Sequence, residues 1–391
     1  MDIVVSGIGV VSALGIGVAQ NVQMLRAGRS GLGNVSLFKT HHRVPVGEVK
    51  SGNDELRRRL GLSPDAHCSR TALLGMLAAK EALDDAHTDA CARIGLISAT
   101  SVGGMDLTEQ FYRDFRRDNT QGRLRMVVHH DSADSTLQIA DYCGIRHFST
   151  TISTACSSSA NAIMLGARLI RAGLLDVAVA GGTDALCRFT LNGFKSLLIL
   201  DEAPCRPFDN TRAGLNLGEG AGYIVLQRAD MPARKTYGRL VGFANTNDAH
   251  HQTATSHSGD GAFLSMSQAL RTAQLSTDAI DYINVHGTGT GNNDASEGAA
   301  LQRLFGDAVP RFSSTKAFTG HTLAAAGGIE AVFALLALRY DTIWPNLNFR
   351  TPMADLPLVP ETTLREGCSL QYVMSNSFGF GGNCTTLIFG K

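Results

Sequence analysis

The amino-acid sequence predicts a layered α/β fold made of two similar halves. Short apolar runs typical of buried strands alternate with longer stretches of helical periodicity along the chain. The composition suits closely packed layers, because 44% of the residues are hydrophobic, 18% are charged and 42 of 391 are glycine. The alternation starts again after the charged segment 229–240, so we divide the chain into halves at 1–230 and 231–391.

The first half begins with an uncharged, β-branched run, IVVSGIGVV at 3–11, which predicts a strand buried on both faces. Glycines interrupt this run and no basic segment precedes it, so we do not expect a signal peptide. Residues 30–66 are expected to be irregular and exposed. The other predicted elements of this half are helices at about 18–27, 68–86 and 132–143, and strands at 93–99, 148–153, 176–185 and 218–227.

Residues 154–173, TACSSSANAIMLGARLIRAG, place Cys156 at the start of a predicted buried helix that Gly173 ends. The N-terminus of a helix carries unpaired N–H groups and a partial positive charge, which would stabilise a thiolate and lower the pKa of Cys156. Cys156 is therefore a candidate nucleophile. The alternative is a small apolar core residue, which is what most buried cysteines are.

Residues 105–130 are the least core-like part of the first half. Aromatic residues alternate there with five arginines, Arg113, Arg116, Arg117, Arg123 and Arg125. Such a run is usually a solvated face, and the alternatives are a lid, a subunit contact or a docking site for an acidic partner.

The second half repeats the alternation and brings two histidines into similar positions. His286 directly follows a predicted buried strand, and His321 precedes small residues and a long apolar run, as Cys156 does. One cysteine and two histidines at the ends of buried elements predict a shared reactive site. The predicted elements are strands at 238–246 and 281–286, helices at 262–273 and 295–304, a short strand before a helical segment at 314–340, and two strands around a glycine-rich turn within 371–390.

Four motifs then carry a family resemblance: TACSSSANAI, VHGTGTGNND, SSTKAFTGH and SNSFGFGGN, in this order. They resemble the active-site motifs of elongating β-ketoacyl-acyl carrier protein synthases, in the thiolase superfamily. The segment CRPFDNTRAGLNLGEGAG at 205–222 resembles the linking motif of the same family, so the resemblance covers nearly the whole chain. It implies a five-layered αβαβα fold with a duplicated core, a dimer, and decarboxylative Claisen condensation.

The resemblance also implies a role for each reactive residue. Cys156 would accept an acyl group from the phosphopantetheine thioester of an acyl carrier protein. His286 and His321 would donate hydrogen bonds to the malonyl thioester and stabilise the enolate left by loss of carbon dioxide. The backbone N–H groups of Cys156 and Phe380 would form the oxyanion hole, and the Phe380 ring would act as a gate.

Three further residues are implied in supporting roles, and no metal or soluble cofactor is implied. Lys316 would act electrostatically on the histidines, while Glu330 and Asp294 would organise the surrounding loops. The turn after His286 departs from the common family form, which has Ser in place of Gly289 and a Pro before the last residues.

The segment TSVGGMD at 100–106 resembles the synthases of aryl-polyene and flexirubin-type pigment pathways more than the fatty acid enzymes. The pathway, fatty acid or polyene-type polyketide, therefore stays open. Two other activities are less consistent with the residues. A non-catalytic chain-length-factor-like subunit would lack the nucleophile, and a thiolase acting on coenzyme A esters would carry two cysteines and one histidine.

The expected partners are acyl carrier protein and a second subunit, either identical or chain-length-factor-like. The 35 basic and 35 acidic residues balance, so nucleic acid is not an expected partner. No run reaches the roughly 20 apolar residues of a membrane span, and the eight cysteines lack zinc or CxxC spacing, which favours a cytoplasmic protein with reduced thiols. The candidate docking residues for an acidic carrier protein, with a merely solvated surface as the alternative, are Arg57, Arg58, Arg59, Arg113, Arg116, Arg117 and Arg206.

Overall fold

A computed structural model describes residues 2–88 and 92–391. Within these residues eleven strands form one hydrogen-bonded sheet. The strands are β1 (Ile3–Ser12), β2 (Gly15–Ile16), β3 (Ile94–Ala99), β4 (Phe148–Ile152), β5 (Val177–Asp184), β6 (Gly220–Arg228), β7 (Gly238–Asn247), β8 (Tyr282–Asn284), β9 (Arg311–Ser313), β10 (Tyr372–Phe378) and β11 (Asn383–Gly390). Their order is β4-β3-β5-β6-β1-β7-β11-β10-β8-β9, with β2 paired to β1.

The two halves of this sheet share one topology. In the first half β4, β3 and β5 are parallel, and β6 and β1 follow as antiparallel strands. In the second half β9, β8 and β10 are parallel, and β11 and β7 follow in the same way. The halves join where β1 pairs antiparallel with β7, at Val4–Arg239 and Val5–Gly238. The duplication is therefore visible in the strand order, although the two sequences have diverged.

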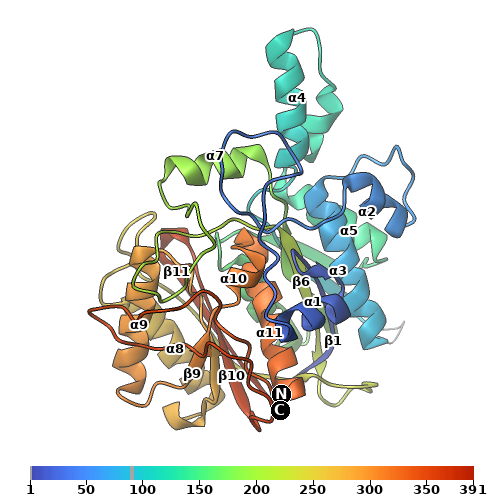
Figure 1. Cartoon of the computed structure of the whole chain (residues 1–391). Helices are drawn as coiled ribbons and strands as arrows, with labels where there is room; N and C mark the ends of the chain where they lie inside the picture. The colour runs from blue at the N-terminus through green and yellow to red at the C-terminus, as the bar shows by residue number, and fades with distance from the viewer. Residues whose placement is uncertain (1, 89–91) are drawn as a thin grey trace.

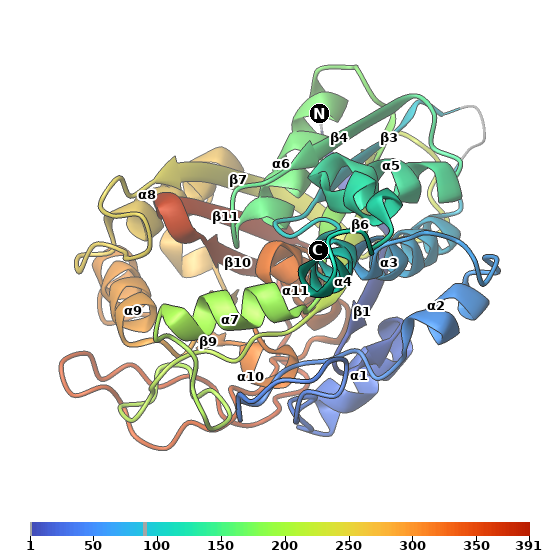
Figure 2. The same ribbon diagram turned by 90° about the horizontal axis from the view of Figure 1, so that it is seen from above.

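Helices fill three layers around the two halves of the sheet (Figure 2). In the central layer α6 (Ser158–Arg171) and α11 (Ala326–Tyr340) pack against each other and against strands of both halves. On the outside, α3 (Arg70–Ala86) and α5 (Ser132–Tyr142) cover the first half. The second half is covered by α8 (Asp260–Ala273), with α9 (Gly291–Phe305) beside it. This is the expected five-layered αβαβα arrangement.

Helix α11 is mostly apolar and lies in the central layer. The segment Leu323–Tyr340 is long and apolar enough to span a membrane by length and composition, but 89% of it is buried inside the protein. Such burial is typical of the core helix of a soluble protein. The helix approaches β6 so closely that a Cβ atom on Gly328 would lie 2.4 Å from the Gly222 carbonyl oxygen.

Several helices differ from the sequence-based expectation. The segment 30–66 is not wholly irregular, since it contains α2 (Asn53–Arg59) and the buried Val44, Val46 and Val49. The predicted helix at 314–340 is broken at Gly320, where φ is 72°. The remaining helices are α1 (Val18–Arg26), α4 (Met105–Arg117), α7 (Arg188–Ser196), α10 (Lys316–Thr319) and the 3₁₀ turns η1 (Leu124–His130), η2 (Thr277–Ala279), η3 (Leu323–Ala325) and η4 (Phe380–Gly382).

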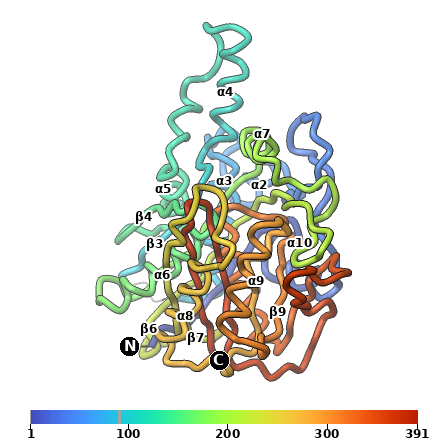
Figure 3. The backbone as a smooth tube through the Cα atoms, turned by 90° about the vertical axis from the view of Figure 1, so that its left-hand side faces the viewer, coloured from blue at the N-terminus to red at the C-terminus, as the bar shows by residue number. Residues whose placement is uncertain are grey.

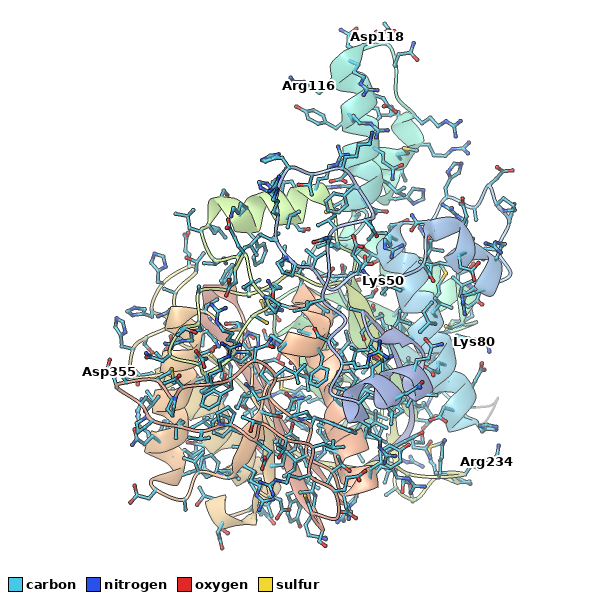
Figure 4. The ribbon with its side chains drawn as sticks, in the orientation of Figure 1. Lys50, Lys80, Arg116, Asp118, Arg234 and Asp355 are labelled. Carbon is cyan, nitrogen blue, oxygen red and sulfur yellow. The ribbon has the colours of Figure 1, made fainter. Side chains whose placement is uncertain are left out.

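Residues 105–130 form an arm that stands clear of the rest of the protein (Figures 1 and 3). Helix α4 runs outward and η1 returns beside it, with Arg116 and Asp118 near the tip (Figure 4). The side chains of Tyr112, Phe115, Leu124 and Val128 are exposed on this arm. The arginine-rich segment is therefore a helical projection that offers both apolar and basic groups to solvent.

Candidate active site

Cys156, His286 and His321 lie together where the two halves of the protein meet. Cys156 lies in the turn between β4 and α6, His286 follows β8, and His321 lies between α10 and η3. The Cys156 Sγ is 3.0 Å from His321 Nε2, and the two imidazole rings are 5.3 Å apart at an angle of 85°. All three residues are buried. The predicted Cys-His-His group is thus present, with the cysteine from one half and both histidines from the other.

The turn before α6 directs Cys156 toward the histidines. Ala155 has a φ of 51°, a left-handed conformation that costs a non-glycine residue energy and is held here by its surroundings. Ser158 supports the turn, because its hydroxyl donates to the Ala155 carbonyl at 2.5 Å and accepts from the Thr154 N–H at 2.7 Å. Small residues are required here because Gly379 packs directly against Cys156.

The predicted lowering of the Cys156 pKa is wrong. Burial raises the pKa of the Cys156 thiol to about 11, and the positive charge of Lys316 and the N–H of Phe380, which donates to the sulfur, only partly oppose this. The negative charges of Glu330 and Asp184 raise it further. Desolvation by burial is the largest of these effects, so the resting residue is a thiol near neutral pH.

Both histidines are neutral and carry their proton on Nε2. Burial, followed by the positive charge of Lys316, holds the pKa of each well below its usual range. The Nδ1 atom of His321 accepts the Leu323 N–H at 3.3 Å, and Nδ1 of His286 faces the Lys316 ammonium at 3.2 Å. Since each Nδ1 faces a donor, the ring proton is placed on Nε2. Two N–H donors therefore point into the site.

Lys316 and Glu330 form a buried ion pair behind His286. The Lys316 ammonium donates to Glu330 Oε1 at 2.5 Å and to the His286 carbonyl at 2.5 Å. Glu330 Oε2 is buried without a partner within the described residues. Burial raises the pKa of Glu330 and Lys316 opposes this. The pair fixes the ammonium against His286 and away from the pocket where a substrate would lie.

Two acidic residues at the start of α9 hold the turn that follows His286. Asp294 accepts the N–H groups of Phe208 at 2.8 Å and of Gly289. Glu297 accepts the N–H groups of His286 and Gly287, each at 2.9 Å, and burial raises its pKa to about 7. Sequence reasoning named Asp294 but missed Glu297. Their spacing of three residues, which puts both carboxylates on one face of a helix, was the available signal.

Two pockets adjoin Cys156, and both have Phe194 and Phe380 in their walls. The first lies on the histidine side and the second is walled mainly by apolar residues of α7 and of the 101–102 loop. The ring of Phe380 stacks on Phe194 of α7, with centroids 5.9 Å apart. Phe194, which sequence reasoning missed, thus lies beside the predicted gate. The first pocket includes Thr253, Ala254, Thr255, Thr288, Thr290 and Asn292, and the second includes Ser101, Val102, Phe189, Leu197 and Leu323.

The same three residues could be considered as a metal site, because their ligand atoms lie within 4.8 Å of one another. The surrounding donors disfavour it. A metal-binding imidazole needs a free lone pair on the coordinating nitrogen and usually donates its other N–H to an acceptor. Here each Nδ1 faces a donor, so Nε2 of His286 and His321 carries a proton in place of that lone pair.

Comparison with known proteins gives matches over the whole fold. Residues 1–231 match the family model for the β-ketoacyl synthase N-terminal domain, and residues 237–350 match the model for the β-ketoacyl synthase C-terminal domain. A 3-oxoacyl-[acyl-carrier-protein] synthase 2 of Rhizobium meliloti is 33% identical, over 100% of this chain and 98% of the relative.

Solved ketosynthase structures match this chain along its full length. A chain of the ishigamide ketosynthase/chain length factor has a TM-score of 0.93 and 30% identity, covering 100% of this chain and 99% of that one. A chain of the ketosynthase ApeO in complex with its chain length factor ApeC, from Xenorhabdus doucetiae, has a TM-score of 0.85 and 34% identity, covering 100% and 98%.

Proposed function

This chain belongs to the β-ketoacyl synthase family of condensing acyltransferases, and we propose that Cys156, His286 and His321 carry out its decarboxylative condensation. The observation that supports this most directly is the position of the Cys156 sulfur, which lies 3.0 Å from His321 Nε2 and within 4.8 Å of a ring nitrogen of His286. A site with one nucleophile and two neutral hydrogen-bond donors suits acyl transfer followed by stabilisation of an enolate.

In the first step the sulfur of Cys156 attacks the thioester carbonyl of an acyl group on a carrier protein. The C–S bond to the carrier breaks, and the proton of Cys156 ends on the released carrier thiol. The oxyanion of the intermediate would be held by the N–H groups of Cys156 and Phe380. The Phe380 N–H already faces the sulfur, which supports this placement.

In the second step a malonyl group on the carrier protein loses carbon dioxide. The electron pair of the broken C–C bond forms an enolate, whose oxygen accepts the Nε2–H groups of His286 and His321. The enolate carbon attacks the acyl carbonyl on Cys156, and the product leaves as a β-ketoacyl thioester. The departing Cys156 thiolate is received by His321 Nε2–H, 3.0 Å away. Loss of one such donor typically lowers the rate by about 10²–10³.

Lys316 acts through His286 and does not need to touch substrate. Burial is the main reason that the pKa of His286 is low, and the Lys316 ammonium lowers it further and favours the Nε2–H tautomer. We further propose that no metal or soluble cofactor takes part, because protonated Nε2 atoms offer hydrogen bonds in place of metal lone pairs. The pairing of a cysteine with two histidines also supports decarboxylation of malonyl over the thiolase reaction.

Replacement of Cys156 tests these assignments. With Cys156→Ala, condensation between acyl- and malonyl-carrier protein should fall to background, and undiminished product would contradict the nucleophile. With Cys156→Gln, malonyl decarboxylation should persist while condensation is lost. Loss of both activities in a folded Cys156→Gln variant would show that the roles are divided incorrectly.

We propose that the pathway is polyene-type polyketide synthesis and that the second subunit is chain-length-factor-like. The similarity to chains of the ishigamide ketosynthase/chain length factor and of the ApeO–ApeC complex supports this. The apolar pocket on the α7 side of Cys156 has exposed walls at Phe189 and Leu197, which a second subunit would cover. Intact mass spectrometry of the protein purified with its partners would report the subunit and the acyl mass on Cys156. If the protein copurified with identical subunits alone, this result would contradict the heterodimer.

We propose that an acidic acyl carrier protein docks in the cytoplasm through the arm rather than through α2. Apart from Arg116 and Arg117 on the arm, each candidate arginine has a carboxylate partner: Arg57 with Asp54, Arg58 and Arg59 with Glu55, Arg113 with Asp114, and Arg206 with Asp201. Arg116 and Arg117 have no ion pair within the described residues. The double variant Arg116→Glu/Arg117→Glu should bind carrier protein more weakly, and its binding should depend less on salt. The control variant Arg271→Glu, on α8, should bind as the unmodified protein does. Equal binding by all variants would contradict this surface.

A further inference from the structure

We propose that Asp184 is a positioning residue of the condensing site. It holds the turn behind His321 and the wall of the apolar pocket on the α7 side of Cys156 (the acyl-side pocket) in one fixed arrangement. This proposal rests on the condensing function given above. Asp184 is the last residue of β5 and is fully buried. Asp184 takes no part in the proposed acyl and proton transfers.

The Asp184 carboxylate binds the loop that follows the neighbouring strand β3. Oδ1 accepts the Thr100 hydroxyl at 2.5 Å and the Val102 N–H at 3.2 Å, and Oδ2 accepts the Ser101 hydroxyl at 2.6 Å. The Ser101 N–H lies 3.0 and 3.2 Å from the two oxygens. β3 and β5 are parallel, so their carboxyl ends meet at the same edge of the sheet. Ser101 and Val102 are both wall residues of the acyl-side pocket.

The same carboxylate also binds the second half of the protein. Oδ2 accepts the Ala324 N–H at 2.8 Å. Ala324 follows Leu323, which has a left-handed φ of 55° and whose N–H bonds His321 Nδ1. Leu323 is itself a wall residue of the acyl-side pocket. Asp184 therefore restrains a strained turn that sets the tautomer of His321 and closes one side of the pocket.

The hydrogen-bond pattern favours the ionised carboxylate. Burial raises the pKa of Asp184, and the hydrogen bonds from Ser101, Thr100 and Ala324 oppose this rise. The N–H groups of Ser101, Val102 and Ala324 can only donate, and together they occupy both oxygens. An amide at this position would place an NH₂ group against at least one backbone N–H. The negative charge also disfavours the Cys156 thiolate, so retention of Asp184 is explained by position and not by activation of the nucleophile.

The first experiment measures condensation and product length in Asp184→Asn. We expect the rate per folded molecule to fall by about 10- to 100-fold, because small displacements of reacting groups have such effects, and we expect the chain length of the product to change. Asp209→Asn is the matched control, since Asp209 is another fully buried carboxylate whose bonds go to Thr211, Arg350 and Thr351. It should lower the melting temperature without changing product length. Equal behaviour of the two variants would reduce Asp184 to a structural role and overturn the proposal.

The second experiment follows alkylation of Cys156 by iodoacetamide, which needs neither substrate nor carrier. We expect Cys156 to be alkylated more slowly in Asp184→Asn than in the unmodified protein. In a His321→Ala background, adding Asp184→Asn should have no further effect on the rate. These two results together would show that Asp184 acts through His321. Faster alkylation in Asp184→Asn would show an effect of charge and overturn the proposal. Additive effects of Asp184→Asn and His321→Ala on the alkylation rate would also overturn it. If the unmodified protein never acquires an acyl group on Cys156, the condensing function fails, while the alkylation result still decides the role of Asp184.

Discussion

At Cys156 two local effects oppose each other, and the structure shows which is larger. The Lys316 ammonium and the Phe380 N–H favour a thiolate, whereas burial favours the thiol. Removal of the sulfur from water is the larger effect and brings its pKa to about 11. Reactivity at Cys156 therefore depends on groups that receive charge during the reaction rather than on a standing thiolate.

This balance predicts the pH dependence of Cys156 alkylation by iodoacetamide. The thiolate is the reactive form, so between pH 7 and 9 the rate should rise about tenfold per pH unit without a plateau. Peptide mass spectrometry would report the adduct on Cys156, and Cys156→Ala provides the control for the other cysteines. A plateau near pH 7 would show that the field of the helix outweighs burial after all.

Asp106, at the base of the arm, carries a second prediction. Its Oδ2 accepts the Arg70 N–H while Oδ1 has no partner within the described residues, and burial raises its pKa to about 6. When the pKa of a carboxyl is higher in the folded than in the unfolded state, the folded protein loses stability as the pH rises through the interval between these two pKa values. Asp106→Asn should therefore increase the free energy of unfolding by about 1–3 kcal/mol at pH 8 and by less at pH 5, as measured by urea denaturation. The same gain at both pH values would exclude ionisation of Asp106 as the cause.

At the scale of elements, periodicity identified the helices and strands that face a core. It did not identify α4, because aromatic and basic residues alternate on a helix that mostly faces solvent. It also missed α7, whose apolar residues cover the active site rather than a core, and it joined α10 to α11 across Gly320. Local sequence does not record which elements a segment will meet, and these segments depend on such contacts.

Helix packing gives a prediction at two glycines. Gly328 of α11 lies against Gly222, whereas a Cβ atom on Gly193 of α7 would meet no atom within 4 Å. Gly328→Ala should lower the free energy of unfolding by about 1–3 kcal/mol, because added volume forces the layers apart. Gly193→Ala should raise it by about 0.5–1 kcal/mol through the reduced flexibility of the unfolded chain. Thermal denaturation of both variants decides this, and stabilisation by Gly328→Ala would contradict the close contact.

At the scale of the whole molecule, the layered fold and the Cys-His-His group could be predicted because each half repeats one pattern and each reactive residue follows a buried strand or precedes a buried helix. Asp184 could not be assigned from sequence in the same way, and for Glu297 the spacing from Asp294 was the only signal. Their partners lie on other elements, such as Ala324, which is 140 positions from Asp184. The pKa of Cys156 was mispredicted for the same reason, since burial is a property of the assembled layers.

The antiparallel contact between β1 and β7 also predicts that the two halves can assemble without a continuous backbone between them. Residues 229–237, which connect the two halves, are largely exposed, while the contacts that join the halves lie in the sheet and in the central pair of helices. Two polypeptides, 1–231 and 237–391, should therefore complement each other when they are coexpressed. Each polypeptide alone would expose the apolar surface that the central layer buries, and we expect it to aggregate. Copurification with recovered condensation would establish this, whereas two separately soluble fragments that do not associate would contradict it.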